Sequence, residues 1–282
     1  MKPGSQQHYD SHLSSFYAWM AGGTAAAIDR NRKFLEAHVG RPGIPARPSG
    51  FSSRLPKRNT TWPGEDARPT INWPEPSPYQ PLAVDLGCGP GVQSVPLAEL
   101  GYRVVAIDNC CLLLAELVIA QGSLPIRLIE ADLTRFRSCI DESPSLIVCL
   151  GDTLTHLPSL EAVASLIRDI GAALKPGGRC LLGFRDYVSR ELVGEQRFIP
   201  VRSDERRILT CFLEYHPDHV LVHDLLHERS DTGWTQRVSA YRKLRLDPAW
   251  VVDSLSDAGL IVVEPFVESG MVCLAAGKPA LS

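Results

Sequence analysis

A glycine-rich turn with carboxylates beside it is the part of the sequence best suited to bind a ligand. Residues 84–91 read VDLGCGPG, between an apolar run and a stretch with helical spacing. Glycine allows a tight turn and lets backbone N–H groups approach a ligand closely. Asp85 lies in the apolar run before the turn, and Asp108 ends the next apolar run along the chain. We therefore expect a small-molecule site at the ends of two adjacent strands.

Three details of this turn distinguish between two ligand classes. Its spacing is GxGxG, whereas dinucleotide sites have GxGxxG. Asp85 suits an ammonium group or a bridging water but would repel a pyrophosphate, and Asp108 can accept both hydroxyls of a ribose. The turn therefore favours S-adenosyl-L-methionine over NAD. The alternative of a glycine-rich turn without a ligand is disfavoured, because strand, loop, helix and acid follow in a consistent order.

A third acid, Asp132, follows the apolar run 126–130 and can accept a hydrogen bond from an adenine amino group. An acid after a strand is also a common helix cap, and this alternative stays open. The residues expected to contact the cofactor are Asp85, Gly87, Cys88, Gly89, Gly91, Asp108, Asn109, Ala131, Asp132, Leu133, Leu150 and Gly151.

The elements that position these residues follow an α/β pattern. Short apolar runs alternate with amphipathic ones, which predicts βαβ units and a parallel sheet covered on both faces. Strands are expected at 82–86, 103–107, 126–130, 146–150 and 179–184, and helices at 92–100, 111–121 and 160–174. Three strand-like runs at 207–213, 219–228 and 235–246 then predict an inserted antiparallel meander. A helix at 248–258 and strands at 260–266 and 271–276 complete the chain.

The N-terminal third divides into two parts. Residues 8–39 have helical spacing, whereas residues 40–81 hold ten of the 22 prolines. Proline fixes φ and lacks an N–H donor, so no regular element is expected in that segment. We expect a helical lid at 1–39, a Pro-rich loop or linker at 40–81 and one catalytic domain at 82–282. Residues 186–246 would form a β insertion on its substrate side.

The composition argues against nucleic acid and membranes as partners. The net charge of −3 offers no basic field for nucleic acid, and no apolar run is long enough to span a bilayer. The N-terminus lacks the apolar core of a signal peptide, and the eight cysteines form no CxxC pair, so we expect a cytoplasmic protein. His219, His223 and His227 lie on one face of an expected strand. Neighbouring members of this set are about 13 Å apart, which is too far for them to bind one metal ion. We therefore expect no metal.

The quoted motifs resemble those of class I methyltransferases. DLGCGPG at 85–91 resembles their first motif, and LKPGG at 174–178 resembles the turn before their fifth strand. The resemblance covers about residues 82–277. It implies a Rossmann-like seven-stranded sheet with helices on both faces and an antiparallel last strand. It further implies S-adenosyl-L-methionine as cofactor and S-adenosyl-L-homocysteine as product. Ligands of open α/β sheets bind beyond the carboxyl ends of the strands.

Two further segments resemble the glycine/sarcosine N-methyltransferase group: CLGDTLTHLP at 149–158 and GFRDY at 183–187. That resemblance implies that Gly151, Asp152 and His156 line the methyl-acceptor pocket and that Arg185 binds a carboxylate. Asp152 departs from the group, which has Asn there, and this suggests a different substrate. The resemblance further implies an aromatic acceptor lid formed by Tyr9, Tyr17 and Trp19.

Each acceptor residue also has a structural alternative. Arg185 could be a surface arginine, His156 could begin a helix, and Tyr17 and Trp19 could belong to a core. The motif typical of nucleic-acid amino-methyltransferases, Asp/Asn-Pro-Pro-aromatic, is absent at 149–158, and no paired-glutamate loop of arginine methyltransferases is found.

We expect transfer of a methyl group to a nitrogen, or as the weaker alternative an oxygen, of a small polar molecule. Because the donor methyl group is already activated, the protein mainly aligns and desolvates the reactants. A base is needed only for a protonated acceptor, and Asp152 or His156 would serve. The alternatives are a cofactor-binding regulatory or scaffold protein without turnover, and an NAD-dependent oxidoreductase. The sequence indicates neither nucleic acid nor membrane as partner, and it leaves the oligomeric state open.

Overall fold

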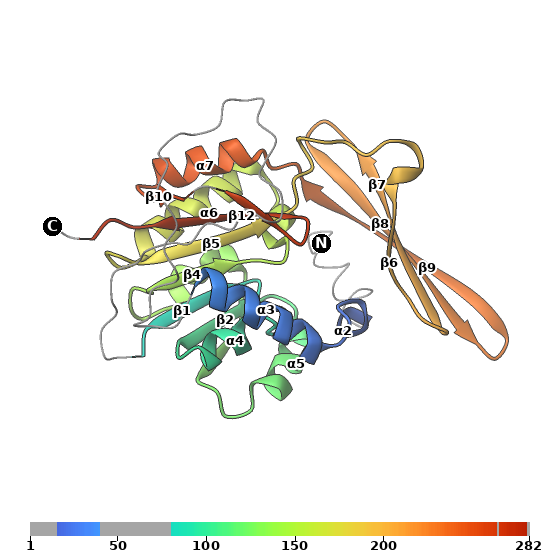
Figure 1. The fold of residues 1–282 in the computed structure, drawn as a ribbon, viewed down its shortest axis with the longest axis horizontal. Coiled ribbons are helices and arrows are strands. Elements are labelled where there is room, and N and C mark those ends of the chain that lie inside the picture. The colour runs from blue at the N-terminus through green and yellow to red at the C-terminus, as the bar shows by residue number, and fades with distance from the viewer. Residues whose placement is uncertain (1–15, 40–79, 264, 281–282) are drawn as a thin grey trace.

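A mostly parallel sheet forms the centre of the computed structural model, which describes residues 16–39, 80–263 and 265–280 (Figure 1). Its order is β10-β12-β5-β4-β1-β2-β3, and β1 pairs in parallel with both β2 and β4. The carboxyl ends of β1 to β5 therefore share one edge, as the sequence analysis requires. The strands are β1 Leu82–Leu86, β2 Arg103–Asp108, β3 Ile126–Glu130, β4 Leu146–Cys149 and β5 Arg179–Phe184.

The last strands complete the sheet in the antiparallel sense. Strand β12 (Met271–Gly277) runs antiparallel to β5 and to the short β10 (Ile261–Val262). The path thus contains the seven expected strands with an antiparallel last strand. One additional short strand, β11 (Phe266–Glu268), pairs with β12 outside this path.

Helices cover both faces because the central strands β1, β4 and β5 are buried on both sides. One face packs on α3 (Thr24–His38), α4 (Ser94–Glu99) and α5 (Cys111–Gln121). The other packs on α6 (Leu160–Ala173), α7 (Pro248–Asp257) and the 3-10 helix η2 (Leu133–Cys139). In β1, Ala83 belongs to the first core and its neighbours Leu82 and Val84 to the second. Alternation along each strand thus builds two cores.

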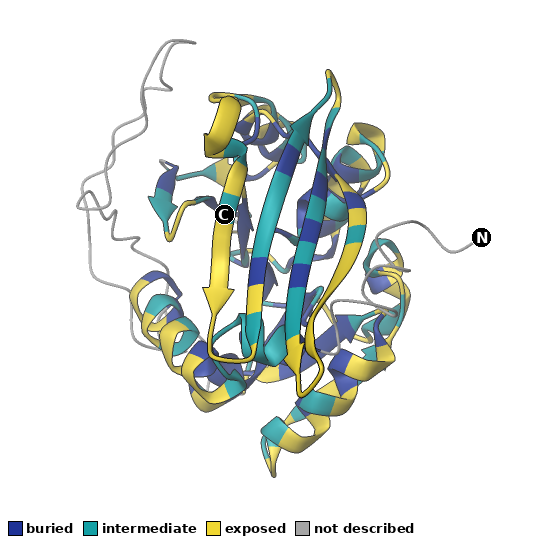
Figure 2. Ribbon diagram, turned by 90° about the vertical axis from the view of Figure 1, so that its right-hand side faces the viewer, coloured by how far each residue is buried: buried dark blue, intermediate teal, exposed yellow. Residues whose placement is uncertain are grey.

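A second, antiparallel sheet is inserted between β5 and α7. Its order is β6-β7-β8-β9, with β6 Phe198–Ser203, β7 Arg207–Tyr215, β8 His219–Ser230 and β9 Gly233–Leu244; a short 3-10 helix, η4 (Gly194–Arg197), precedes it. The sequence analysis expected three strands, and β6 is a fourth. It contains Pro200, which lacks an N–H donor and is tolerated in a strand at the edge of a sheet. Figure 2 shows this sheet from the front, with its edge strands β6 and β9 mostly exposed.

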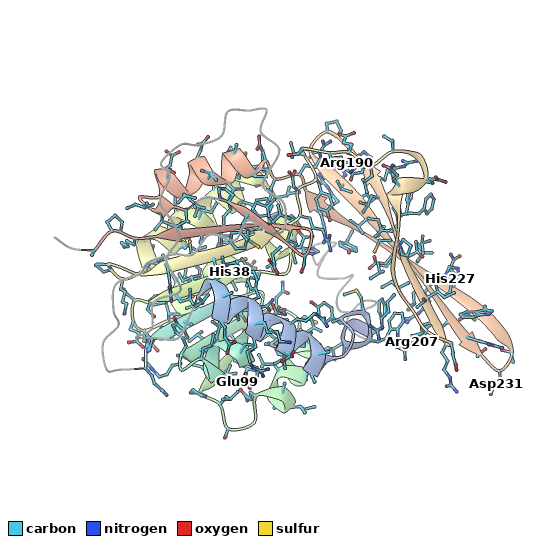
Figure 3. All side chains as sticks on the ribbon, in the orientation of Figure 1. His38, Glu99, Arg190, Arg207, His227 and Asp231 are labelled. Carbon is cyan, nitrogen blue, oxygen red and sulfur yellow. The ribbon has the colours of Figure 1, made fainter. Side chains whose placement is uncertain are left out.

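The described N-terminal residues form two helices, α2 (Tyr17–Met20) and α3, separated by Gly22 and Gly23 at positive φ. Phe16, just before α2, packs on Leu209 and Leu226 of the inserted sheet. The guanidinium of Arg207 lies 5.4 Å from the ring of Trp19, and Figure 3 places Arg207 beside α2. This segment therefore bridges the inserted sheet and the core.

Much of the Pro-rich segment expected at 40–81 lies outside the described residues, which resume at Gln80. In the described part of the chain, no helix combines the length and the apolar character needed to cross a bilayer.

Candidate active site

The glycine turn lies between the ends of β1 and β2. Gly87, Gly89 and Gly91 all have positive φ, the left-handed region that suits glycine. The backbone N–H of Gly87 donates to the carbonyl of Ile107 at 2.8 Å, which fixes the turn against β2. A Cβ on Gly91 would lie 2.2 Å from Cδ1 of Leu117, so this glycine allows α5 to pack against the turn.

Asp108 holds the other side of this turn. Its Oδ2 accepts the backbone N–H of Gly89 at 2.8 Å, and its Oδ1 accepts that of Cys110 at 2.8 Å. Burial raises the pKa of this carboxyl group, while these backbone N–H groups act in the opposite direction. A carboxylate oxygen accepts more than one hydrogen bond, so Asp108 keeps capacity for ribose hydroxyls.

A cavity of about 650 Å³ opens beyond these strand ends. Its wall joins the glycine turn, the segments after β3 and β4, helix α6 and strand β9. The predicted site residues on this wall are Tyr17, Gly87, Cys88, Gly89, Asp108, Asn109, Ala131, Asp132, Leu133, Leu150, Gly151 and His156. The structure thus brings together residues from the ends of four strands and from the N-terminal segment.

Two glycines on this wall leave room for a ligand. A Cβ on Gly89 would meet only Cδ1 of Leu113, at 3.9 Å, and one on Gly151 only Nε2 of Gln93, at 4.0 Å. Both positions face the cavity, so a side chain there would occupy ligand space. Together with the free acceptor capacity of Asp108, this open backbone surface fits S-adenosyl-L-methionine, and contact between its ribose and Asp108 stays a prediction.

Asp132 caps a helix, which is one of the two roles that its sequence position suggested, and its contact with adenine stays a prediction. Its Oδ1 accepts the backbone N–H of Thr134 at 2.9 Å and the Thr134 hydroxyl at 2.7 Å, so it caps η2. The same residue lines the cavity. Capping of η2 therefore also fixes the part of the wall that Asp132 forms.

Asp85 and Gly91, both expected at the cofactor, are not on the cavity wall. Asp85 is 1% exposed, and its Oδ2 accepts the hydroxyl of Ser94 at 2.6 Å at the start of α4. Burial raises its pKa to about 7. Asp85 and Gly91 therefore support the glycine turn from the side away from the cavity. Asp85 bonds α4, and Gly91 packs against α5.

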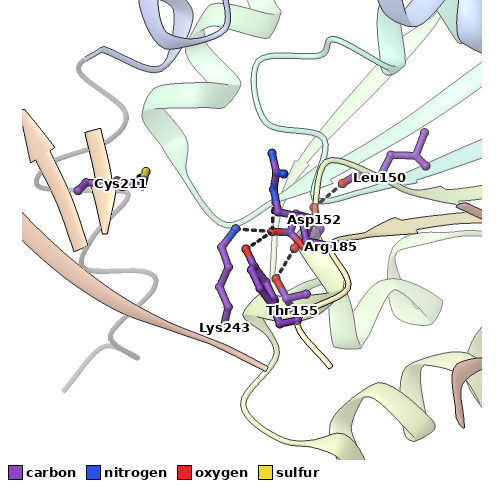
Figure 4. Close-up of polar contacts among 9 residues, drawn as sticks. Leu150, Asp152, Thr155, Arg185, Cys211 and Lys243 are labelled. Carbon is purple, nitrogen blue, oxygen red and sulfur yellow. Dashed lines mark hydrogen bonds and ion pairs between the residues drawn. The ribbon is translucent and has the colours of Figure 1, made fainter. Parts of the chain in front are cut away.

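Asp152 was expected to face the acceptor but lies behind the wall. It is 3% exposed and accepts the backbone N–H of Arg185 at 2.8 Å and the ammonium of Lys243 (Figure 4). The Tyr187 hydroxyl donates to it at 3.4 Å. Burial opposes ionisation of Asp152, but Lys243, the Arg185 N–H and His156 together hold its pKa below the usual value. A carboxylate bonded in this way is a poor base, since its lone pairs are already engaged.

The other acceptor residues differ in placement. The His156 ring lines the cavity and stacks on Tyr241, with 5.5 Å between ring centres. The half-exposed side chain of Arg185 reaches to 4.0 Å from Asp152 and does not line the cavity. Trp19 does not line the cavity, and its Nε1 donates to Asp204 in the turn between β6 and β7. Tyr9 lies outside the described residues.

The sequence analysis missed several residues on the wall. They are Val92, Gln93, Leu113, Thr134, Thr153, Leu157, Pro158, Ala162, Ser165, Leu166, Asp169, Arg242 and Leu244. Gln93 and Thr134 follow predicted site residues closely enough to have been included. No sequence motif near Arg242 and Leu244 marks them as site residues, because only the fold of the inserted sheet brings the end of β9 to the cavity.

The comparisons with known proteins agree with this geometry. A family model described as a methyltransferase domain matches residues 83–178, which hold the glycine turn, Asp108 and Asp152. Residues 83–178 thus match a methyltransferase domain. The expected Rossmann-like fold is confirmed. The match to a methyltransferase domain agrees with the expected enzyme class and with S-adenosyl-L-methionine as its cofactor, and the activity of the whole protein stays a proposal. The methyl acceptor and its target atom stay predictions.

Curated relatives match the chain over a limited length. The cypemycin N-terminal methyltransferase of Streptomyces sp is 35% identical over 123 residues, 42% of this chain and 49% of that protein. The glycine/sarcosine N-methyltransferase of Aphanothece halophytica is 26% identical over 106 residues, 37% of this chain and 40% of that protein. The chain thus matches half or less of the length of these relatives.

Solved structures extend the likeness of fold to the whole chain. The sugar N-methyltransferase of Streptoalloteichus sp has a TM-score of 0.64 at 14% identity, and the match covers 96% of this chain and 94% of that one. A methyltransferase from Clostridium acetobutylicum has a TM-score of 0.61 at 16% identity and covers 72% of this chain and 85% of that one. At such identities the likeness concerns the fold.

Proposed function

We propose that this chain transfers a methyl group from S-adenosyl-L-methionine to a nitrogen of a small polar molecule and releases S-adenosyl-L-homocysteine. The observation that carries the proposal is the composition of the cavity wall. Cofactor-type residues from the methyltransferase domain share one cavity with Tyr17 of the N-terminal segment and Arg242 of the inserted sheet. Elements outside the domain thus complete the wall of the cavity.

When bound, the cofactor supplies a methyl group on a positively charged sulfur, which a neutral nitrogen can displace in line. The residues of the chain then have three tasks. Gly89 and Gly151 present open backbone, and Asp108 accepts hydrogen bonds, so that the donor is oriented. Tyr17 and the end of β9 limit the entry of water. His156, on the wall, can take the proton that the acceptor nitrogen loses.

The acceptor class follows from the polar groups on the wall. Arg242 and His156 line the cavity, where Arg242 has donors beyond the Nη2 that bonds Asp218 at 3.0 Å, whereas Asp152 is neutralised behind the wall. An amine that also carries an acidic or polar group fits this set better than a long aliphatic chain. Two kinds of relative, a cypemycin N-terminal methyltransferase and glycine/sarcosine N-methyltransferases, support nitrogen as the target, whereas two ubiquinone biosynthesis O-methyltransferases among the relatives keep oxygen as the weaker alternative.

The test has two stages. Isothermal titration calorimetry with S-adenosyl-L-homocysteine and, separately, with NADH examines the ligand class. Methyl-labelled S-adenosyl-L-methionine with a panel of amino acids, amino sugars and short peptides then examines turnover. Binding without transfer to any amine or hydroxyl would favour the regulatory alternative, and binding of NADH alone would refute the proposal.

A further inference from the structure

A buried ion pair joins the inserted sheet to the methyltransferase core. Lys243 of β9 is 8% exposed, and its ammonium donates to Oδ2 of Asp152, which directly precedes the 3-10 helix η3 (Thr153–His156). Two charges leave water only at considerable cost, which good geometry and further hydrogen bonds must offset. The Arg185 backbone N–H and the Tyr187 hydroxyl supply such bonds to Asp152. The pair is therefore a fixed link between the two parts of the fold.

The pair lies directly behind the wall of the cavity. Gly151 and Thr153, on either side of Asp152, both line the cavity. Arg242 and Leu244, on either side of Lys243, line it as well. A displacement of either charged partner would therefore move wall residues on both sides.

Asp152 also holds an unfavourable backbone conformation. Its φ is +74°, in the left-handed region that residues with a Cβ avoid. Such a conformation persists only where surrounding contacts impose it. The Asp152 side chain accepts the hydrogen bonds from Lys243 and Arg185. Its backbone N–H donates to the carbonyl of Gly183 at 3.3 Å, and its carbonyl accepts the Thr155 hydroxyl at 2.8 Å. The conformation of Asp152 sets the direction in which η3 begins.

The first residue of η3 packs against the glycine turn. A Cβ on Gly87 would lie 2.4 Å from Cγ2 and 2.7 Å from Oγ1 of Thr153, so the Thr153 side chain touches the turn at this point. The Thr153 hydroxyl also donates to the carbonyl of Leu150 at 2.8 Å. A continuous series of contacts thus runs from Lys243 through Asp152 and Thr153 to Gly87.

We propose that Lys243, on the inserted sheet, is a positioning residue for the cofactor site. It holds Asp152 in place, and Asp152 in turn holds Thr153 against the glycine turn. The proposal rests on the proposed function, because it concerns the affinity for the same cofactor. It means that a residue outside the domain at 83–178 tunes cofactor binding, and that docking of the inserted sheet and cofactor binding are coupled.

A double-mutant cycle tests this coupling. The affinity for S-adenosyl-L-homocysteine is measured by calorimetry for wild type, Lys243→Met, Asp152→Asn and the double variant. We expect each single variant to bind about tenfold more weakly, because an unpaired group is left buried behind the wall. We expect the double variant to bind no more weakly than the worse single variant, since the two changes remove one interaction. Lys33→Met, on the exposed face of α3, is the matched control and retains wild-type affinity.

The pH dependence distinguishes positioning by charge from loss of packing. The charged and titratable groups that face Asp152 are Lys243, Arg185, His156 and Tyr187. Without the Lys243 ammonium, burial favours the protonated form of Asp152, so its pKa rises. The affinity gap between wild type and Lys243→Met should therefore widen from pH 5 to pH 8, as the unpaired carboxylate ionises. The double variant, which has Asn at 152, should show no such widening.

The outcomes are distinct. If wild type does not bind S-adenosyl-L-homocysteine, the proposed function is wrong and this inference with it. If wild type binds and Lys243→Met binds within twofold of it, or with a pH-independent gap, only this inference is overturned. Near-ultraviolet circular dichroism shows whether Lys243→Met folds. If it does not, the isosteric variant Asp152→Asn decides the question. Wild-type affinity of that variant overturns the proposal, and a loss of about tenfold supports it.

Discussion

The carboxylate of Asp108 accepts the backbone N–H of Gly89 at 2.8 Å, so the acid at the end of β2 holds the glycine turn at the end of β1. One side chain thereby has two roles. It shapes the turn from within, and it offers its remaining lone pairs to a ligand in the cavity.

Loss of this carboxylate should weaken cofactor binding. We expect Asp108→Ala to reduce the affinity for S-adenosyl-L-homocysteine by roughly 1.5–3 kcal/mol, because charge-assisted hydrogen bonds to the ligand are lost. Asp108→Asn retains one acceptor oxygen and should lose less. Calorimetry measures both. Equal affinity of Asp108→Ala and wild type would place the ribose elsewhere.

Asp85 should make stability depend on pH. Burial raises the pKa of Asp85 to about 7, well above its value in an unfolded chain. Between pH 4 and 7 the folded state therefore binds more protons than the unfolded state, and stability falls as pH rises. We expect Asp85→Asn to be more stable relative to wild type at pH 8 than at pH 5.

Urea unfolding of both proteins between pH 5 and 8 measures this difference in free energy, which can change by up to about 1.4 kcal/mol per pH unit. Asp253→Asn on the exposed side of α7 controls for the substitution itself. A difference between wild type and Asp85→Asn that is constant with pH would contradict the prediction.

Two glycines of the same turn should respond differently to alanine. Gly91→Ala brings a Cβ to 2.2 Å from Leu117 at a φ of +85°, so we expect a loss of about 2–3 kcal/mol of stability. Gly89→Ala meets open cavity space, so strain should cost only about 1 kcal/mol of stability while the methyl group obstructs the ligand. Urea unfolding and calorimetry should show that Gly91→Ala chiefly lowers stability and Gly89→Ala chiefly lowers affinity. Identical profiles would show that the two glycines have the same role.

The acceptor should depend more on Arg242 than on Arg185. Arg242 lines the cavity, whereas the Arg185 guanidinium lies beside Asp152 outside it. With an acceptor that carries a carboxylate, we expect Arg242→Lys to lower kcat/KM about tenfold, because a planar donor pair is lost. Arg185→Lys should have a smaller effect, and both should bind S-adenosyl-L-homocysteine nearly as wild type does. The reverse order in steady-state kinetics would restore the role that the family resemblance assigns to Arg185.

The sequence by itself determined the class of the fold and the place of the glycine turn between two strands. Residues 84–91 and Asp108 are local signals, because a glycine turn and a strand-terminal acid need only their neighbours to form. Apolar alternation likewise predicted parallel strands with helices between them, because each strand of such a sheet is covered on both faces.

Only the tertiary structure decided which side chains face the cavity. Asp152 follows a predicted strand as Asp108 does, yet Lys243, 91 residues later, engages its carboxylate behind the wall. Arg242 and Leu244 reach the cavity only because β9 returns to the core. Contacts between residues so far apart in sequence depend on the packing of whole elements, and no spacing rule within one segment contains that information.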